Sequence, residues 1–143
     1  IKHEIRGIKL VKRLCKRLRV PNDIRDLAML VCEYHLHSHR AFELKAKTLE
    51  KLFKSLDLYR KPERLKLFLL ACEADAKGRL GFEDKAYPQA DYIKETFLAV
   101  QNISIKDIDT EQLQGPEIGQ ALAQKRIAII EEIRQKHRTT KAE

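Results

Sequence analysis

The sequence contains no tryptophan, and glycine and proline are scarce, with five and four residues among 143. These two residue types interrupt helices and form tight turns, so their scarcity, together with 43% hydrophobic residues, favours a mainly helical protein over a sheet protein. No apolar run approaches the roughly 20 residues that span a bilayer, so a membrane protein is not expected. The length suffices to bury a real core. We therefore predict an all-α domain.

The sequence also lacks the cysteine pattern of a disulfide framework. Cys15, Cys32 and Cys72 are odd in number, form no C-x-x-C pair and lie in apolar periodic segments. This pattern is typical of reduced core thiols and predicts a cytoplasmic protein. The chain begins at Ile1 without an initiator methionine, and "IKHEIRG" has no apolar stretch of a signal peptide. We interpret the chain as a piece of a longer protein.

Apolar residues recur at helical spacing over most of the chain and predict six helices. Their expected ranges are 5–18, 23–39, 48–56, 62–77, 88–100 and 116–137, with a connector over 103–116 that contains one helical turn and a frayed end after 137. Pro21 marks a break, after which Asn22 or Asp23 caps the second helix, and Gly78 ends the fourth.

Two helices carry the buried stripes that later arguments need. The expected stripes are Ile8, Val11, Leu14, Cys15 and Leu18 on the first helix, and Ile24, Leu27, Ala28, Val31 and Tyr34 on the second. On the last helix, Ile118, Leu122, Ile129 and Ile133 are expected to dock the tail on the body.

Positive charge is concentrated at one end of the chain. The formal net charge is +8, and residues 1–20 contribute eight cations against Glu4, which is 8 − 1 = +7. Clustered Lys and Arg attract phosphate backbones through counterion release, whereas the few scattered aromatics do not indicate base stacking. We predict that structured RNA binds here, the alternative being a solvated helix face. The candidate RNA-binding residues are Lys9, Lys12, Arg13, Lys16 and Arg17, with Lys125, Arg126 and Arg134 of the last helix as further candidates.

Three histidines at every second position, His35, His37 and His39, suggest a metal cage. In a helix, however, alternate residues point to nearly opposite sides, whereas residues four apart share a face. His35 and His39 are therefore expected to point inward and His37 to solvent. The alternative is that the inward pair is structural, hydrogen-bonded or half-exposed near the helix end.

A carboxylate on another helix strengthens the functional interpretation. Phe68, Cys72 and Asp75 fall at i, i+4 and i+7, which predicts a buried Asp75 that needs a cation, a donor network or a metal. The structural alternative is that Arg79, one helical turn further on, is the cationic partner of Asp75. His3 precedes the first helix and can approach its N-terminal end. Three histidines and an aspartate from three helices would suit a metal site for phosphate chemistry.

Three segments carry a resemblance to a known family: "RLRVPNDIRDLAMLVCEYH", "RKPERLKLFLLACEADAKGR" and "GPEIGQALAQKRIAII". Together they resemble the C-terminal portion of the bacterial multifunctional CCA proteins, which are tRNA nucleotidyltransferases with an HD-type phosphohydrolase domain. The resemblance runs from His3 to about Ile130. It implies an all-α fold, in which a helical bundle of HD-domain type over residues 1–86 is followed by a C-terminal helical, tRNA-binding tail over 87–143.

The resemblance also implies two activities in the parent protein. One builds and repairs the tRNA 3′ CCA end from CTP and ATP with Mg²⁺. The other is a 2′,3′-cyclic phosphodiesterase, 2′-nucleotidase and phosphatase that uses Ni²⁺ or Mg²⁺. His3, His35 and His39 correspond to the later histidines of the HD-type metal site, and Asp75 to its late aspartate. The early histidine, the His-Asp dyad, and the Gly-Ser loop and paired aspartates of the nucleotidyltransferase head are absent. No catalytic set is complete, and the fragment alone is expected to be inactive.

A competing hypothesis from another class is a non-catalytic, all-helical RNA-binding or scaffold module in which the histidines are structural. The expected partners are tRNA, and CTP and ATP through the missing head, with no membrane; a homodimer is left open. The discriminating observation is whether an His-Asp dyad precedes Ile1 in the complete reading frame.

Overall fold

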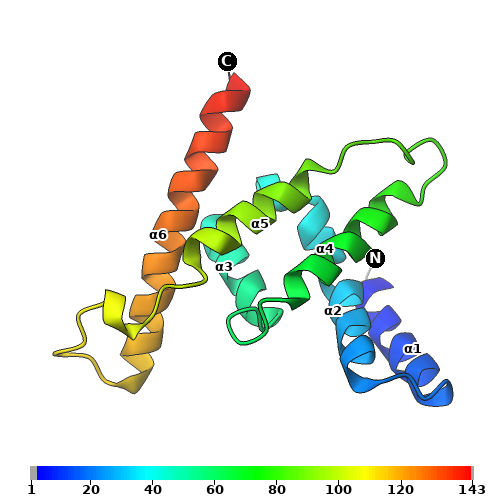
Figure 1. Cartoon of the computed structure of the whole chain (residues 1–143), viewed down its shortest axis with the longest axis horizontal. Coiled ribbons are helices and arrows are strands. Elements are labelled where there is room, and N and C mark those ends of the chain that lie inside the picture. Colours follow the sequence, from blue (N-terminus) through cyan, green and yellow to red (C-terminus); the bar gives the residue numbers. More distant parts are fainter. Residues whose placement is uncertain (1–2, 143) are drawn as a thin grey trace.

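The computed structural model describes residues 3–142, and every regular element in that part of the chain is a helix (Figure 1). The elements are α1 His3–Arg17, α2 Asn22–His39, the 3₁₀ turn η1 Ala41–Glu43, α3 Ala46–Ser55, α4 Arg64–Lys77, α5 Pro88–Val100, the 3₁₀ turn η2 Ile105–Asp107 and α6 Gly115–Ala142. The predicted all-α fold is confirmed.

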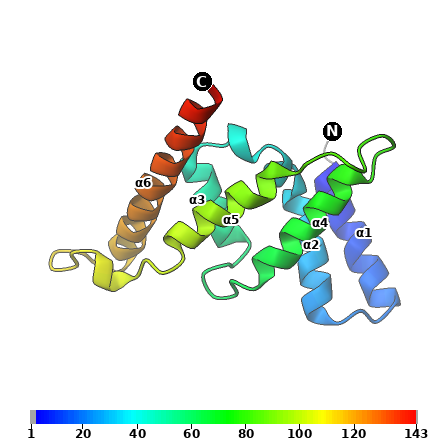
Figure 2. The same cartoon turned by 45° about the horizontal axis from the view of Figure 1, so that its top comes forward.

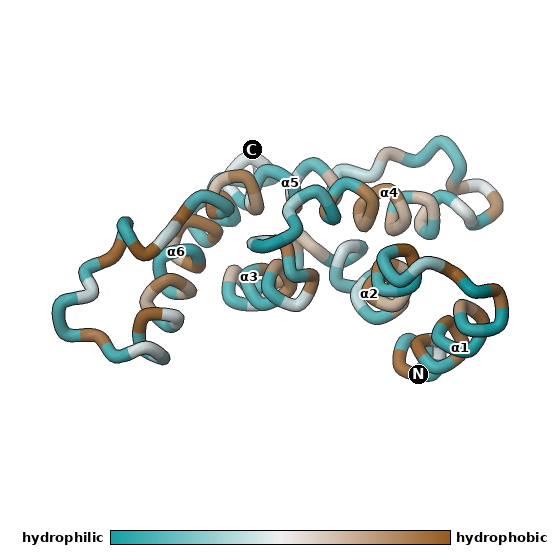
Figure 3. The backbone as a smooth tube through the Cα atoms, turned by 60° about the horizontal axis from the view of Figure 1, so that its bottom comes forward, coloured by the Kyte–Doolittle hydropathy of each residue, from teal (hydrophilic) through white to brown (hydrophobic). Residues whose placement is uncertain are grey.

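The helices are arranged between a hairpin at one end and a long helix at the other. α1 and α2 pack antiparallel to each other, and α6 stands at the opposite end of the molecule (Figure 1). α5 links the two ends, because it contacts both α4 and α6 (Figure 2). In Figure 3, α4 and α5 follow one another along one edge, with α3, α2 and α1 along the other. None of the described helices has the length and apolarity required to cross a bilayer.

The hydrophobic core is centred on α3, α4 and α5. Phe53, Phe68 and Phe97 are fully buried, and the rings of Phe53 and Phe97 meet edge to face with centroids 5.3 Å apart. Burying one such side chain contributes about 1.5–3 kcal/mol. Ile130 of α6 belongs to the same core. The core therefore contains residues from both sides of the predicted boundary at 86/87.

Each predicted helix is present in residues 3–142, but some helix ends differ from the predicted ones. Pro21, not Asn22 or Asp23, occupies the N-cap position of α2, and it makes no side-chain capping bond. Capping by either polar residue was therefore wrong: proline presets the entry backbone, and the helix begins directly after it. The last helix also continues past His137 to Ala142. No glycine or proline interrupts that end, so nothing in the sequence stops the helix there.

The predicted apolar stripes are only partly buried. Cys15 is buried and Ile8 and Val11 are half-buried, but Leu14 and Leu18 are 47% and 60% exposed. On α2, Ile24 is 55% exposed, although Leu27, Val31 and Tyr34 pack on the core as predicted. α1 contacts only one neighbouring helix extensively, namely α2, and a single helix cannot cover the whole apolar face of α1. The outer leucines of α1 therefore stay uncovered by residues 3–142.

α1 and α2 approach closely where glycine meets cysteine. A Cβ added to Gly7 would lie 2.5 Å from Cys32 Sγ, and this thiol donates a hydrogen bond to the Glu4 carbonyl at 3.4 Å. All three cysteines are free, as predicted; Cys15 and Cys72 are buried and Cys32 is half-buried. Gly7 therefore permits the tight packing of the α1–α2 hairpin.

Replacing Gly7 by alanine should lower the free energy of unfolding, because the added methyl group must displace Cys32 or separate the helices. Such overpacking costs about 1–3 kcal/mol, which exceeds the gain of about 1 kcal/mol in helix propensity. Gly119 is the matched control: it lies in α6 with nothing within 4 Å of an added Cβ. Gly119→Ala should stabilise the protein. Urea unfolding followed by circular dichroism measures the free energy of unfolding of both variants. If Gly7→Ala stabilised the protein as much as Gly119→Ala, close packing at Gly7 would be contradicted.

Candidate functional site

Four residues predicted from the sequence form a row across three helices. The ring centroids of His3 on α1 and His35 on α2 are 5.9 Å apart, and those of His35 and His39 are 5.7 Å apart. The row ends at α4, where Asp75 Oδ2 lies 2.7 Å from His39 Nε2. The helical spacing of His35 and His39 places both on one side of α2. Each of the four predicted residues lies next to the following one in this row, and the row does not close into a cluster.

His35 is oriented by its own helix. Its Nδ1 lies 3.0 Å from the Val31 carbonyl oxygen and 3.1 Å from that of Cys32. Carbonyl oxygens only accept hydrogen bonds, so Nδ1 carries the proton and donates to both. The other nitrogen, Nε2, is then unprotonated in the neutral ring. An imidazole fixed in this way presents a lone pair that can accept a proton or bind a cation.

His39 uses both ring nitrogens within the protein. The Asp75 carboxylate accepts from Nε2–H at 2.7 Å, which leaves Nδ1 of a neutral ring to accept from the Tyr87 hydroxyl at 2.8 Å. Tyr87 in turn accepts from the buried Ser38 hydroxyl at 2.7 Å. Gln89 also donates to the His39 carbonyl at 3.1 Å. These contacts fix the position of the imidazole between α4 and the start of α5.

The Tyr87 hydroxyl, which contacts His39, and the buried Cys72 thiol both stay protonated at neutral pH. Burial raises the pKa of Tyr87 to about 12, with a smaller opposing effect of its hydrogen bond to Ser38. Burial also raises the pKa of Cys72 to about 12. Tyr87 is therefore a phenol that can donate to His39 throughout the physiological range, and Cys72 is a thiol and not a reactive thiolate.

His37 does not join the row. Its ring lies edge-on to Tyr34, with centroids 5.5 Å apart. The prediction that it points to solvent was wrong, because the residue is only partly exposed and burial lowers its pKa. Alternate helix positions lie on different sides, but the side of α2 that carries His37 is also partly covered.

Asp75 is more exposed than its sequence spacing predicted. Phe68 and Cys72 are fully buried, but the Asp75 side chain is 53% exposed. The stripe of α4 emerges from the protein over its last turn, close to where the helix ends at Lys77. The partner of Asp75 is His39, and not Arg79 as in the structural alternative. The carboxylate therefore pairs with a titratable group at a partly open position.

The described residues fit only part of a metal site. His35 Nε2 and the exposed Asp75 carboxylate are suitable donors, but His39 has both nitrogens engaged, and His3 is an exposed residue near a chain end. Within residues 3–142, no three His, Cys, Asp or Glu side chains gather closely enough to hold a metal ion. A protein metal site usually needs three or more ligands. A complete coordination shell would require donors beyond these residues.

The predicted RNA-binding face on α1 is accessible. Lys9, Lys12, Arg13, Lys16 and Arg17 are all exposed, and within residues 3–142 none of them pairs with a carboxylate. Lys12, Arg13 and Lys16 line an open groove of about 450 Å³ where α1 meets the start of α2. Arg19 also lines it, as does Arg25, which is paired with Asp26. The unpaired cations of α1 along this groove offer several contacts to a phosphate backbone.

The cations of α6 have structural roles that the sequence did not reveal. The Arg126 side chain is 11% exposed, stacks 3.8 Å from the Tyr59 ring centroid and lies 3.8 Å from Glu50. Arg134 is 9% exposed and donates to the Leu44 carbonyl at 2.9 Å. Neither guanidinium is available to a phosphate, so we correct their prediction as RNA-binding residues. Lys125 is exposed, although its ammonium group donates to the Asp107 carbonyl.

Sequence reasoning missed the residues that orient His39. Ser38 stands beside it in the sequence, but Tyr87 is 48 positions away, in the segment between α4 and α5. No periodic pattern marks a side chain that reaches the site from an irregular segment. The only available signal was that Tyr87 directly precedes Pro88, which begins a helix. The irregular segment after α4 must therefore end at Tyr87, next to the packed helices.

Comparisons with known proteins agree with the family resemblance. No protein-family model and no solved structure matches the chain. The chain is 50% identical over 128 residues to the multifunctional CCA protein of Alkalilimnicola ehrlichii. The alignment covers 90% of this chain and 31% of the relative, so the chain spans less than a third of the length of the curated relative it matches. The predicted similarity to this family is confirmed.

Proposed function

We propose that this chain is the HD-type phosphohydrolase and tRNA-binding part of a multifunctional CCA protein, which builds and repairs the 3′ CCA end of tRNA. The observation that carries this proposal is the 50% identity over 128 residues to a protein of that name. Because the chain spans 31% of that relative, we assign nucleotide addition with CTP, ATP and Mg²⁺ to residues outside this chain. The expected location is the cytoplasm.

The proposed second activity is hydrolysis of 2′,3′-cyclic phosphates and phosphate monoesters. Its support is the row of His3, His35, His39 and Asp75, which combines imidazole and carboxylate donors from three helices. These donor types suit Ni²⁺ or Mg²⁺. We propose that an earlier histidine and an His-Asp dyad of the longer protein complete the metal site, and that this chain supplies its outer half.

The proposed tRNA contact is the basic face of α1. Five exposed cations with no carboxylate partner in the described residues support it. The arrangement suits the regularly spaced phosphates of a folded RNA, and it offers no aromatic platform for reading bases. Lys125 is the one remaining α6 residue of the predicted RNA-binding set that this proposal keeps.

The alternative function is a non-catalytic RNA-binding or scaffold module. The observation in its favour is that both ring nitrogens of His39 are satisfied by Asp75 and Tyr87, as in a structural histidine. The test that separates the two is hydrolysis of 2′,3′-cyclic AMP by the longer protein, with and without Ni²⁺. Metal-dependent hydrolysis is expected. A protein that binds tRNA but hydrolyses no cyclic phosphate under any metal would favour the alternative.

A further inference from the structure

One side of the α1–α2 hairpin carries exposed leucines that neither the candidate site nor the RNA-binding face uses. Leu10, Leu14 and Leu18 are 61%, 47% and 60% exposed. The backbone N–H of Leu18 donates to the Leu14 carbonyl at 2.9 Å, so the helical spacing of α1 extends to Leu18. The three leucines therefore lie on successive turns of one side of the helix, and we call them the leucine stripe. Contiguous apolar surface of this kind marks an interaction surface.

The leucine stripe is separate from the basic face of α1. Successive residues of a helix are rotated by about 100°, so Arg13 and Leu14 point to different sides. Lys9 and Lys16 repeat with Arg13 at helical spacing and share its side. Leucine side chains offer no contact of the kind that a phosphate backbone needs, so the stripe is not an extension of the RNA-binding face.

The leucine stripe begins beside the row of the candidate site. His3, Gly7 and Leu10 lie at i, i+4 and i+7, which places His3 on the same side of α1 as the stripe. The His3 ring lies 5.9 Å from the ring of His35 on α2. The stripe and the His3 end of the row therefore share one side of the α1–α2 hairpin.

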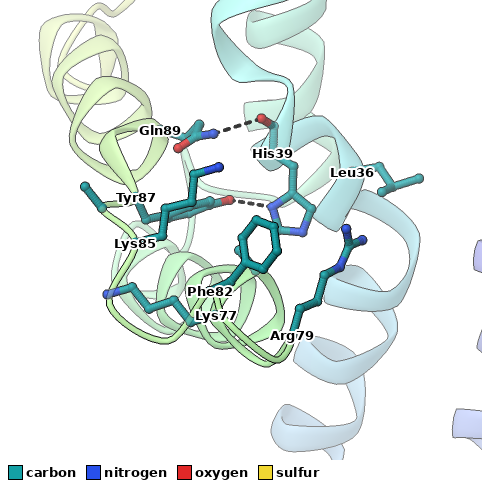
Figure 4. Close-up of a pocket in the computed structure, with 10 residues that line it drawn as sticks. Leu36, His39, Lys77, Arg79, Phe82, Lys85, Tyr87 and Gln89 are labelled. Carbon is teal, nitrogen blue, oxygen red and sulfur yellow. Dashed lines mark hydrogen bonds between the residues drawn. The ribbon is translucent and has the colours of Figure 1, made fainter.

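The two ends of the row differ in how far the protein covers them. At His39, Tyr87 and Gln89 reach over from the start of α5 and hydrogen-bond to the ring and to the backbone carbonyl (Figure 4). At the other end, the His3 side chain is 69% exposed. Within residues 3–142, the row is therefore enclosed at His39 and open at His3, where the leucine stripe starts.

We propose that the leucine stripe is the docking surface for an apolar helix in the part of the longer protein that precedes this chain. The proposal rests on the proposed function, because it requires the chain to be part of a longer protein. Side chains repeated every four residues form a ridge, and such a ridge packs into the groove of another helix. The docked helix lies against the His3 end of the row and covers it.

Two observations favour this occupant. The alignment with the curated relative covers only 31% of that protein, so most of its residues lie outside the matched part. Because the chain resembles the C-terminal portion of these proteins, the remaining length precedes it. A preceding segment enters this structure at the first turn of α1, where His3 marks one end of the stripe. The connection alone therefore brings it close to the uncovered leucines.

The test is thiol labelling of the longer protein with a maleimide, after Leu10→Cys or Leu18→Cys. A docked helix covers both positions, so each new thiol should react at least about tenfold more slowly than an exposed one. Leu98→Cys is the matched control: Leu98 is 51% exposed and lines a different groove, between α4 and α5. Each rate is divided by the rate of the same variant unfolded in urea. Mass spectrometry of peptides separates these labels from those on the native cysteines.

The outcomes separate the possible occupants. Slow labelling at both stripe positions that does not depend on protein concentration or on tRNA supports the proposal. Labelling as fast as at Leu98→Cys would overturn it. Protection that grows with protein concentration would identify a second copy as the occupant, and protection only with tRNA would identify RNA; either result would also overturn it. Circular dichroism checks that each variant is folded. Hydrolysis of 2′,3′-cyclic AMP is measured on the unsubstituted protein, so an exposed stripe in an active protein would refute the docking and not the proposed function.

Discussion

Replacing Asp75 by alanine in the longer protein should lower hydrolysis of 2′,3′-cyclic AMP about 100-fold and leave CCA addition unchanged. The Asp75 carboxylate is the hydrogen-bond partner of His39 Nε2 at 2.7 Å, and its side chain is 53% exposed. Its loss therefore removes a charge from the site without opening a cavity in the core. His35→Ala should have a similar effect, since His35 is the central ring of the row. Initial rates of both reactions on the same preparations measure the separation.

His37→Ala is the matched control for this experiment. It removes an imidazole from the same helix, but its ring lies against Tyr34 and not against the row. Both activities should keep their rates, and thermal unfolding should confirm that each variant is folded. If His37→Ala impaired hydrolysis as strongly as His35→Ala, the assignment of His35 and His39 to one functional face would be wrong.

Changing Lys9, Arg13 and Lys16 together to glutamate should weaken tRNA binding at least about 30-fold at low salt. These three exposed cations have no carboxylate partner in residues 3–142, so each is free to contact a phosphate. Losing three phosphate contacts should also reduce the slope of log Kd against log salt concentration by about 2 to 3. Filter binding of tRNA over a series of salt concentrations measures both quantities.

The control is an equal change of charge elsewhere on the surface. Lys61, Lys66 and Lys94 are exposed, and their replacement by glutamate alters the net charge of the protein by the same amount. This variant should retain most of its affinity and the original salt dependence. Equal loss in both triple variants would mean that tRNA responds to total charge, and α1 would not be a defined binding face.

The sequence predicted the helices well because their periodic apolar residues are local signals. α5 agrees with its predicted range, and Gly78 follows the last residue of α4. The exposure of Leu14 and Leu18 was not predictable in the same way, since periodicity tells which residues share a face and not whether another helix covers it. The same limit explains Asp75, which shares a face with Phe68 but lies where α4 leaves the core.

The candidate site was predictable only in those parts that depend on helical geometry. The spacing of His35 and His39 fixes their common face, and the structure brings them together with Asp75. The contribution of Tyr87 depends on the path of the irregular segment after α4, which no local pattern specifies. For Arg126 the sequence predicted a function that the structure does not support. Its position beside Lys125 suggested RNA binding, but tertiary packing buries it against Tyr59.

The most direct test of the account is the affinity of Ni²⁺ for this chain and for the longer protein, measured by isothermal titration calorimetry. The described residues provide only part of a coordination shell. The chain should therefore bind Ni²⁺ about 100-fold more weakly than the longer protein does, and Asp75→Ala should weaken binding in the longer protein. Two results would contradict the assignment of this chain as the outer half of a phosphohydrolase metal site. One is an equal affinity of Ni²⁺ for the two proteins, and the other is tight Ni²⁺ binding by the longer protein that Asp75→Ala does not weaken.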